Sequence, residues 1–177
     1  MKGAIIPSVI FKTRVRDDSI GGDNPFKWVD VNSQSIFGAG ANILFSLPGA
    51  FTPTCSTFQL PGFEKLAKDF YELGVDNIYC MSVNDSFVMN AWGKSQNLDQ
   101  VKVLPDGNGE FTRYMGMLID KRHLGFGMRS WRYAAYIKDG IVEGWFCEPG
   151  INNIGSDSDP YGETKPENVL NWLKNKD

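Results

Sequence analysis

The chain has 177 residues, of which 42% are hydrophobic and 22% charged, and its formal net charge is −3. This length and composition predict one folded domain over residues 1–177 and argue against a disordered or fibrous protein. The weak negative charge offers no basic surface for phosphates, so neither nucleic acid nor an anionic membrane is an expected partner.

Targeting and metal-binding signals are weak. No run approaches the ~18 apolar residues of a membrane span, and the apolar stretch in MKGAIIPSVIFKTRVRDD is too short for a signal peptide. We therefore expect a cytoplasmic protein. The three cysteines, Cys55, Cys80 and Cys147, form no C-x-x-C pair, and His123 is the single histidine. We therefore expect neither a disulfide scaffold nor a metal site. The chemistry should come from a thiol, carboxylate or hydroxyl without a cofactor.

The first predicted elements form a strand, helix, strand unit. Residues 41–47 are a short apolar run that ends at Pro48 and Gly49, and residues 76–83 are a second such run, so both predict buried strands. Between them, apolar residues recur at helical spacing from Phe63 to Leu73. Gly74 follows directly and is typical of a helix end.

The second half predicts a mixed sheet. Asp85 is a candidate N-cap for a helix over the residues that follow, and residues 101–104 predict a short strand. Asp139-Gly140 predicts a tight hairpin between strands 133–138 and 141–147, because both turn positions need positive φ. Residues 164–173 predict a C-terminal helix. The expected fold class is α/β, with a central mixed sheet and helices on both faces.

The segment between the first strand and the first helix carries the candidate chemistry. Pro53 suits the first helical position, which makes Thr52 the N-cap and Cys55 the third helical residue. In the first turn, unpaired backbone N–H groups and the helix dipole favour a thiolate over a thiol. A lone cysteine is otherwise usually a small buried hydrophobe. An N-cap threonine needs no catalytic role, so position alone leaves Thr52 undecided.

Four stretches of sequence resemble one protein family. Pro48, Thr52 and Cys55 spell P-x-x-x-T-x-x-C, which resembles the active-site motif of peroxiredoxins. The strings FSLPGAFTPTCS, SVNDSFVMNAW, PDGNGEF and GFGMRSWRYA resemble the type-five members, called type II in plants. The resemblance implies a thioredoxin-like fold in which Cys55 attacks the peroxide O–O bond. It also implies that the Thr52 hydroxyl binds a peroxide oxygen and that Pro48 shields the thiolate.

The resemblance further implies an arginine that stabilises the thiolate and the peroxide. The family's arginine directly precedes the next strand, which indicates Arg132, with Arg129 in a supporting role. The alternative for Arg129 is a solvated surface charge. Catalytic candidates are therefore Cys55, Thr52 and Arg132, and the substrate-binding candidates are Pro48, Gly49 and Arg129.

The thiol that regenerates Cys55 is left open. Some family members carry a resolving cysteine after the last hairpin, but residues 150–160 contain none. Cys80 occupies the position of a second cysteine in plant members, but it lies within a predicted strand, where packing as a small buried side chain is the favoured explanation. With a tight turn, counting outward pairs Arg132 with Cys147, which would place Cys147 near the site. A strand cysteine nevertheless cannot easily come within the roughly 7 Å between Cα atoms that a disulfide requires.

External reduction is therefore expected. The resemblance implies glutathione with a separate glutaredoxin, or alternatively thioredoxin, and it implies a homodimer. A disulfide oxidoreductase or redox sensor on the same fold is the main alternative, although Ser56 and Phe58 replace a C-x-x-C partner. A cysteine hydrolase would need His123 as its base.

Overall fold

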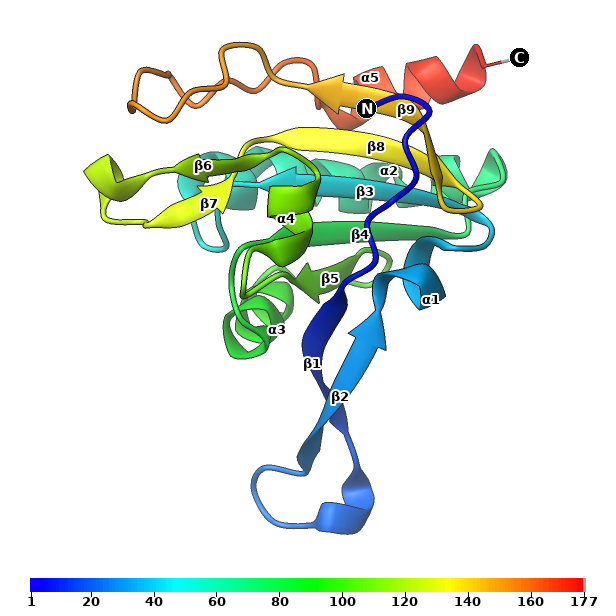
Figure 1. Ribbon diagram of the computed structural model, residues 1–177. Helices are drawn as coiled ribbons and strands as arrows, with labels where there is room; N and C mark the ends of the chain where they lie inside the picture. The colour runs from blue at the N-terminus through cyan, green and yellow to red at the C-terminus, as the bar shows by residue number, and fades with distance from the viewer. Residues whose placement is uncertain (177) are drawn as a thin grey trace.

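The computed structural model describes residues 1–176 and contains a central five-stranded sheet (Figure 1). Strand β3 (Ala41–Leu47) runs parallel to β4 (Asn77–Ser82) and antiparallel to β8 (Tyr133–Lys138), which confirms the predicted mixed sheet. The boundaries of the predicted strands shift by one residue at most. The strand order is β5 (Lys102–Pro105), β4, β3, β8 and β9 (Ile141–Cys147).

Helices cover both faces of this sheet, as predicted. On one face, buried residues of the sheet pack with α2 (Leu60–Glu72), α3 (Ser86–Ser95) and α5 (Pro166–Lys174). On the other face they pack with α1 (Ser33–Phe37) and α4 (Glu110–Tyr114). Cys55 and Cys80 belong to the first of these two clusters. The site is thus built on the α2 side of the sheet.

The predicted helix signals act as expected. Phe63, Ala67 and Phe70 are buried along α2, and Gly74 adopts a φ of +91° just beyond its end. The Asp85 carboxylate accepts a hydrogen bond of 2.9 Å from the backbone N–H of Val88, so Asp85 is the N-cap of α3. None of the helices between residues 1 and 176 combines the length and apolarity that a membrane crossing requires.

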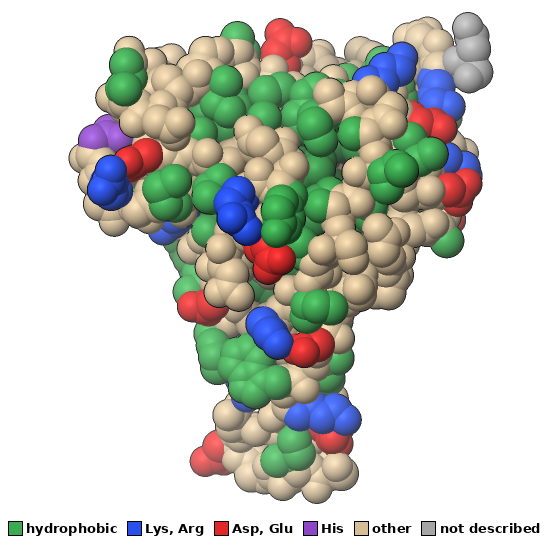
Figure 2. Space-filling model, viewed as in Figure 1, with side chains coloured by type: hydrophobic (Ala, Val, Ile, Leu, Met, Phe, Trp, Pro, Cys, Tyr) green, Lys and Arg blue, Asp and Glu red, His purple; other side chains and the backbone are tan. Residues whose placement is uncertain are grey.

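Two hairpins were not predicted from the sequence. Strands β1 (Ile10–Arg16) and β2 (Phe26–Asn32) form a ribbon that extends away from the body (Figure 1), and β6 (Leu118–Asp120) pairs with β7 (Met128–Ser130). Most of the ribbon is solvated on both faces, so its sequence lacks the alternation of a half-buried strand. The rings of Trp28 in β2 and Phe87 in α3 meet edge to face, with their centroids 5.6 Å apart. Figure 2 shows hydrophobic side chains on the surface where the ribbon leaves the body.

The last hairpin corrects one expectation. Asp139 and Gly140 have φ values of +48° and +79°, as the turn requires. A bulge at Glu143 then shifts the register, so Cys147 pairs with Tyr133 and not with Arg132. Because adjacent strand residues face opposite sides, Cys147 lies away from the site. The bulge coincides with Gly144, where a Cβ atom would approach the Trp172 ring of α5 to 2.7 Å.

Candidate active site

The segment that follows β3 turns sharply before the helix begins. The Thr52 hydroxyl donates a hydrogen bond of 2.7 Å to the carbonyl of Gly49, and Phe51 adopts a φ of +63°. Helical structure starts at Pro53, and the Thr52 carbonyl accepts a bond of 3.0 Å from the N–H of Ser56. Cys55 therefore lies in the first turn, as expected, although the Thr52 side chain itself does not cap the helix.

The helix widens immediately after this start. Residues Cys55–Gln59 form a π-helical turn, labelled η2, in which the N–H of Leu60 donates to the carbonyl of Cys55. Pro61 supplies a reason: it has no N–H to offer and its ring would clash with the carbonyl of Thr57 in a regular helix. Such turns often occur at functional sites. Pro61 was the signal in the sequence that could have indicated the widened turn, and the sequence analysis did not predict that turn.

Arg132 connects Cys55 to two other side chains. One terminal nitrogen, Nη1, donates to Cys55 Sγ at 3.4 Å and also contacts Gln59 Oε1. The other, Nη2, pairs with Asp159 Oδ1 at 2.6 Å. Arg132 is only 1% exposed. Burial alone would lower the pKa of Arg132, but the negative charges of Cys55 and Asp159 raise it overall, so the guanidinium stays charged.

The sulfur of Cys55 lies in a buried position against this cation. Cys55 is 1% exposed, and its Sγ lies 3.4 Å from Arg132 Nη1 within the first helical turn. The Asp159 carboxylate is the second partner of the same guanidinium, at the opposite terminal nitrogen. The geometry therefore brings a cysteine side chain into contact with a fixed cation.

Arg129 is half-buried and holds the backbone around the site. Its Nη1 donates to the carbonyl of Pro48 at 2.9 Å and its Nε donates to the carbonyl of Phe126 at 3.0 Å. Burial lowers the pKa of Arg129, and the charge of Cys55 works against that shift. Gly49 is needed for this approach, because a Cβ atom there would collide with Arg129 Nη1. Arg129 is thus not a solvated surface charge.

The other two cysteines are poorly placed to react with Cys55. Cys80 is fully buried in β4, and burial, followed by the charge of Cys55, raises the pKa of its thiol well above the ordinary value. Cys147 lies on the opposite face of the sheet with its sulfur 3.9 Å from Met117 Sδ. Burial and the charge of Glu148 raise the pKa of Cys147. All three thiols are free.

A cavity of about 390 Å³ adjoins the site. His123 lies in its wall, where the ring contacts Gly155, and no hydrogen bond between described residues joins it to Cys55. The sequence did not indicate Gln59 or Asp159 as site residues, because neither stands in a periodic or motif position. The lining residues are Pro48, Thr52, Pro53, Lys121, His123, Leu124, Phe126, Gly155, Asp157, Ser158 and Asp159.

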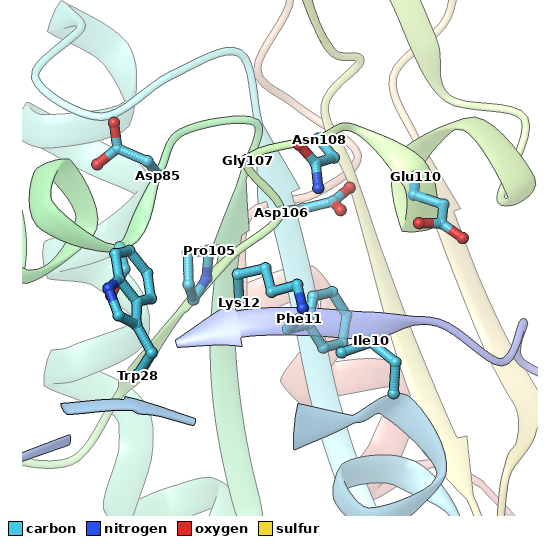
Figure 3. A pocket seen from close by; sticks show the side chains of 11 residues that line it. Ile10, Phe11, Lys12, Trp28, Asp85, Pro105, Asp106, Gly107, Asn108 and Glu110 are labelled. Carbon is cyan, nitrogen blue, oxygen red and sulfur yellow. The ribbon is translucent and has the colours of Figure 1, made fainter. Parts of the chain in front are cut away.

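A second cavity, of about 170 Å³, lies between β1 and the loops that precede α3 and α4 (Figure 3). Two of its polar side chains already have partners. Asp106 accepts from the Thr112 N–H and hydroxyl at 2.8 and 2.7 Å, and Lys12 pairs with Asp30 at 2.9 Å. Within residues 1–176 there is no cluster of three or more histidine, cysteine or acidic side chains arranged to hold a metal ion.

Known proteins resemble this chain in both sequence and fold. The redoxin family model matches residues 28–161. A peroxiredoxin from Rhizobium etli is 60% identical over 169 residues, which cover 96% of this chain and 94% of that protein. The structure of the Plasmodium falciparum antioxidant protein, a 1-Cys peroxiredoxin, is 36% identical with a TM-score of 0.88 and covers 98% of this chain and 99% of that one.

A second solved structure was obtained with a bound peroxide. Reduced Prx3 from Vibrio vulnificus in complex with hydrogen peroxide is 32% identical with a TM-score of 0.83, covering 99% of this chain and 96% of that one. The matches over nearly the whole length, together with the mixed thioredoxin-like sheet, establish the family. The chain therefore belongs to the peroxiredoxins of the redoxin family, of the type-five kind, and is a thiol peroxidase.

Proposed function

We propose that Cys55 is the attacking thiolate and that it reduces hydrogen peroxide and alkyl hydroperoxides. Thr52 and Arg132 contact the peroxide, while Pro48, Gly49 and Arg129 shape the site around it. The observation that carries this proposal is the buried contact of 3.4 Å between Arg132 Nη1 and Cys55 Sγ. A fixed donor beside the nucleophile stabilises charge that develops on the peroxide oxygens without reorganisation during the reaction.

The chemical step follows from these positions. The sulfur of Cys55 attacks one peroxide oxygen, an S–O bond forms, and the O–O bond breaks. The departing oxygen takes the electron pair of that bond and is protonated to water or an alcohol. Cys55 becomes a sulfenic acid, the first stage of cysteine oxidation. Arg132 donates a hydrogen bond to the peroxide, and the Thr52 oxygen accepts one from the peroxide O–H while its own proton stays hydrogen-bonded to the Gly49 carbonyl. Together they align the O–O axis with the sulfur, which supplies rate by orientation.

Two observations support this range of peroxides. The Vibrio vulnificus relative was solved with hydrogen peroxide, which is the smallest substrate of the class. The cavity beside Thr52 has apolar walls that include Leu124 and Phe126, which suit the hydrocarbon part of an alkyl hydroperoxide.

We propose that an external thiol reduces the sulfenic acid, with glutathione and glutaredoxin favoured over thioredoxin. Glutathione condenses with the sulfenic acid to a mixed disulfide and releases water. A second thiol then cleaves that disulfide and restores Cys55. Support comes from the unfavourable positions of Cys80 and Cys147 and from the similarity to a protein described as a 1-Cys peroxiredoxin.

The first test traps the sulfenic acid. One equivalent of hydrogen peroxide is added to the reduced protein in the presence of a sulfenic acid probe, and the labelled residue is mapped. We expect rapid labelling at Cys55 that Cys55→Ser abolishes, while Cys80→Ser and Cys147→Ser leave it unchanged. Slow labelling of all three cysteines would contradict the proposal and favour a redox-sensing role.

The second test compares reductants. Peroxide turnover is measured with glutathione and glutaredoxin, and separately with thioredoxin and its reductase. Turnover only with the first pair is expected. Turnover with thioredoxin alone would overturn the glutaredoxin assignment and leave the peroxidase chemistry intact.

Three broader expectations belong to the same proposal. Residues 1–177 act as one domain, and two copies form a homodimer, which light scattering can check at several concentrations. A cytoplasmic location fits the three free thiols, since reducing compartments keep cysteines unpaired.

A further inference from the structure

We propose that Asp159 is a positioning residue that holds the Arg132 guanidinium in the orientation that peroxide reduction by Cys55 requires. This inference rests on the proposed function of Cys55 and adds a residue to its machinery. Asp159 lies in the loop between β9 and α5. In the sequence this loop was considered only as the place where some family members carry a resolving cysteine, which this chain lacks.

The two ends of the guanidinium have different partners. Nη1 faces Cys55 and Gln59, whereas Nη2 is held by Asp159 Oδ1 at 2.6 Å. Because the guanidinium is rigid and planar, fixing Nη2 also fixes the direction of Nη1. Arg132 is 1% exposed and the Asp159 side chain is 46% exposed, so the carboxylate closes the solvent side of the arginine. Asp159 also lines the cavity beside Thr52.

Asp159 is itself held in place by a buried ion pair. Its N–H donates to Asp157 Oδ1 at 2.9 Å, and Asp157 Oδ2 accepts from Lys121 Nζ at 2.8 Å. The side chains of Lys121 and Asp157 are 5% and 7% exposed. Burial alone would raise the pKa of Asp157, but the bonds from Lys121 and Asp159 lower it overall. This carboxylate therefore remains an acceptor at neutral pH.

The backbone at Asp159 supports the same conclusion. Its φ of +52° is a left-handed conformation that few residues other than glycine adopt, although aspartate tolerates it better than most. Such conformations persist where surrounding contacts fix them and are concentrated at functional sites. Here the contacts on both sides are the Asp157 carboxylate and the Arg132 guanidinium.

Asp159 has two effects on the chemistry, and they have opposite signs. It orients Arg132, which favours the reaction, and its negative charge competes with the thiolate for the same cation, which disfavours ionisation. The ring centroid of Tyr161 lies 5.7 Å from Arg132 Cζ, and the charge of Glu148 reaches Tyr161. The charge of Cys55 acts on the Arg129 cation and on the buried thiol of Cys80. Loss of a residue with only a structural role would not move the pH dependence of Cys55 alkylation.

The test separates ionisation from reaction. Asp159→Asn keeps an oxygen acceptor without the charge, Asp159→Ala removes both, and Glu163→Gln is the matched control because it neutralises an exposed carboxylate four positions along the same segment. For each protein, the rate of Cys55 alkylation by iodoacetamide is followed against pH, and the rate of oxidation by hydrogen peroxide is measured where alkylation has reached its plateau. Thermal unfolding verifies that each variant is folded.

We expect the alkylation midpoint of Asp159→Asn to move to lower pH, because the guanidinium is no longer shared between two anions. The plateau rate of oxidation in Asp159→Ala should fall about tenfold or more through loss of alignment, with Asp159→Asn in between. Glu163→Gln should match the unmodified protein in both measurements. An unchanged oxidation rate, or a slower one without the shift in Asp159→Asn, would overturn the positioning role. Failure of the proposed function would instead appear in the unmodified protein, as absence of selective oxidation at Cys55.

Discussion

At the scale of single residues, Arg132 places a positive charge in a buried position beside Cys55. Its guanidinium reaches Cys55, Gln59 and Asp159 from one buried position. The sequence indicated this arginine only through the family resemblance, in which an arginine directly precedes the next strand. It indicated Cys55 through both the helix start and the family motif. The partners Gln59 and Asp159 could not be predicted, because their contacts depend on the widened helical turn and on a loop folding back.

Arg132→Lys tests whether the shape of the cation matters. Lysine keeps the charge but has no planar fork that could contact Cys55 and Asp159 together. We expect the rate of oxidation by hydrogen peroxide to fall by about 10²–10³, with a smaller effect on alkylation of Cys55 near neutral pH. Arg113→Lys on the exposed surface of α4 is the control. Equal peroxide rates for both variants would refute the role of Arg132.

Gly49→Ala tests the packing between the Pro48 turn and Arg129. The added methyl group would collide with Arg129 Nη1 and break its bond to the Pro48 carbonyl. We expect lower thermal stability and slower oxidation of Cys55. Gly93→Ala in α3 is the matched control, because its new Cβ would make only an ordinary contact of 3.5 Å with Val103. A Gly49→Ala enzyme as fast as the Gly93→Ala enzyme would argue against this role.

At the scale of elements, the sequence predicted what depends on local pattern. The buried runs of β3 and β4, the apolar spacing of α2 and the Asp139-Gly140 turn each carry a local signal, and each element is present. The bulge in β9 has no such signal: it lies beside Gly144, where a Cβ atom would approach the ring of Trp172, a residue distant in sequence. That single bulge moved Cys147 to the opposite face and made the expected pairing with Arg132 wrong.

Glu148 anchors the loop between β9 and α5. Its buried carboxylate accepts hydrogen bonds from the N–H groups of Gly162, Glu163 and Thr164 at 2.7, 2.9 and 2.8 Å. Glu148→Ala leaves these donors without their acceptor, and we expect the free energy of unfolding in urea to fall by about 3 kcal/mol. Glu163→Ala, at an exposed side chain in the same segment, should change it by less than about 0.5 kcal/mol. Equal losses for the two variants would contradict this account of the loop.

At the scale of the whole molecule, the sequence predicted the sheet and its two layers of helices, but not the β1–β2 ribbon. The two buried clusters pack on opposite faces of one sheet. Burial of tyrosine hydroxyl groups within this molecule makes its stability depend on pH in the alkaline range. Tyr133 lies in the cluster opposite Cys55, and burial raises the pKa of its hydroxyl far above 10.0. Burial also raises the pKa of Tyr161 to about 12.

The raised pKa values of Tyr133 and Tyr161 make the folded protein less stable at high pH. Because the folded protein holds these phenolic protons more tightly than the unfolded chain, the stability they contribute is complete below pH 10.0 and is lost as pH rises beyond it. We expect urea unfolding to show that loss, and Tyr133→Phe to reduce it. Tyr114→Phe, at an exposed position, should leave the pH dependence as it is. An identical alkaline loss in Tyr133→Phe would contradict the assignment.

The central claim is that Cys55 reacts with peroxide because the Arg132 guanidinium is held in contact with its sulfur. The most direct measurement is the second-order rate of oxidation by hydrogen peroxide, compared between the unmodified protein, Cys55→Ser and Arg132→Met. We predict that Cys55→Ser abolishes the fast reaction and that Arg132→Met, which removes the cation, slows it by about 10²–10³. A fast reaction that survives in Cys55→Ser, or a rate that Arg132→Met leaves unchanged, would contradict this claim.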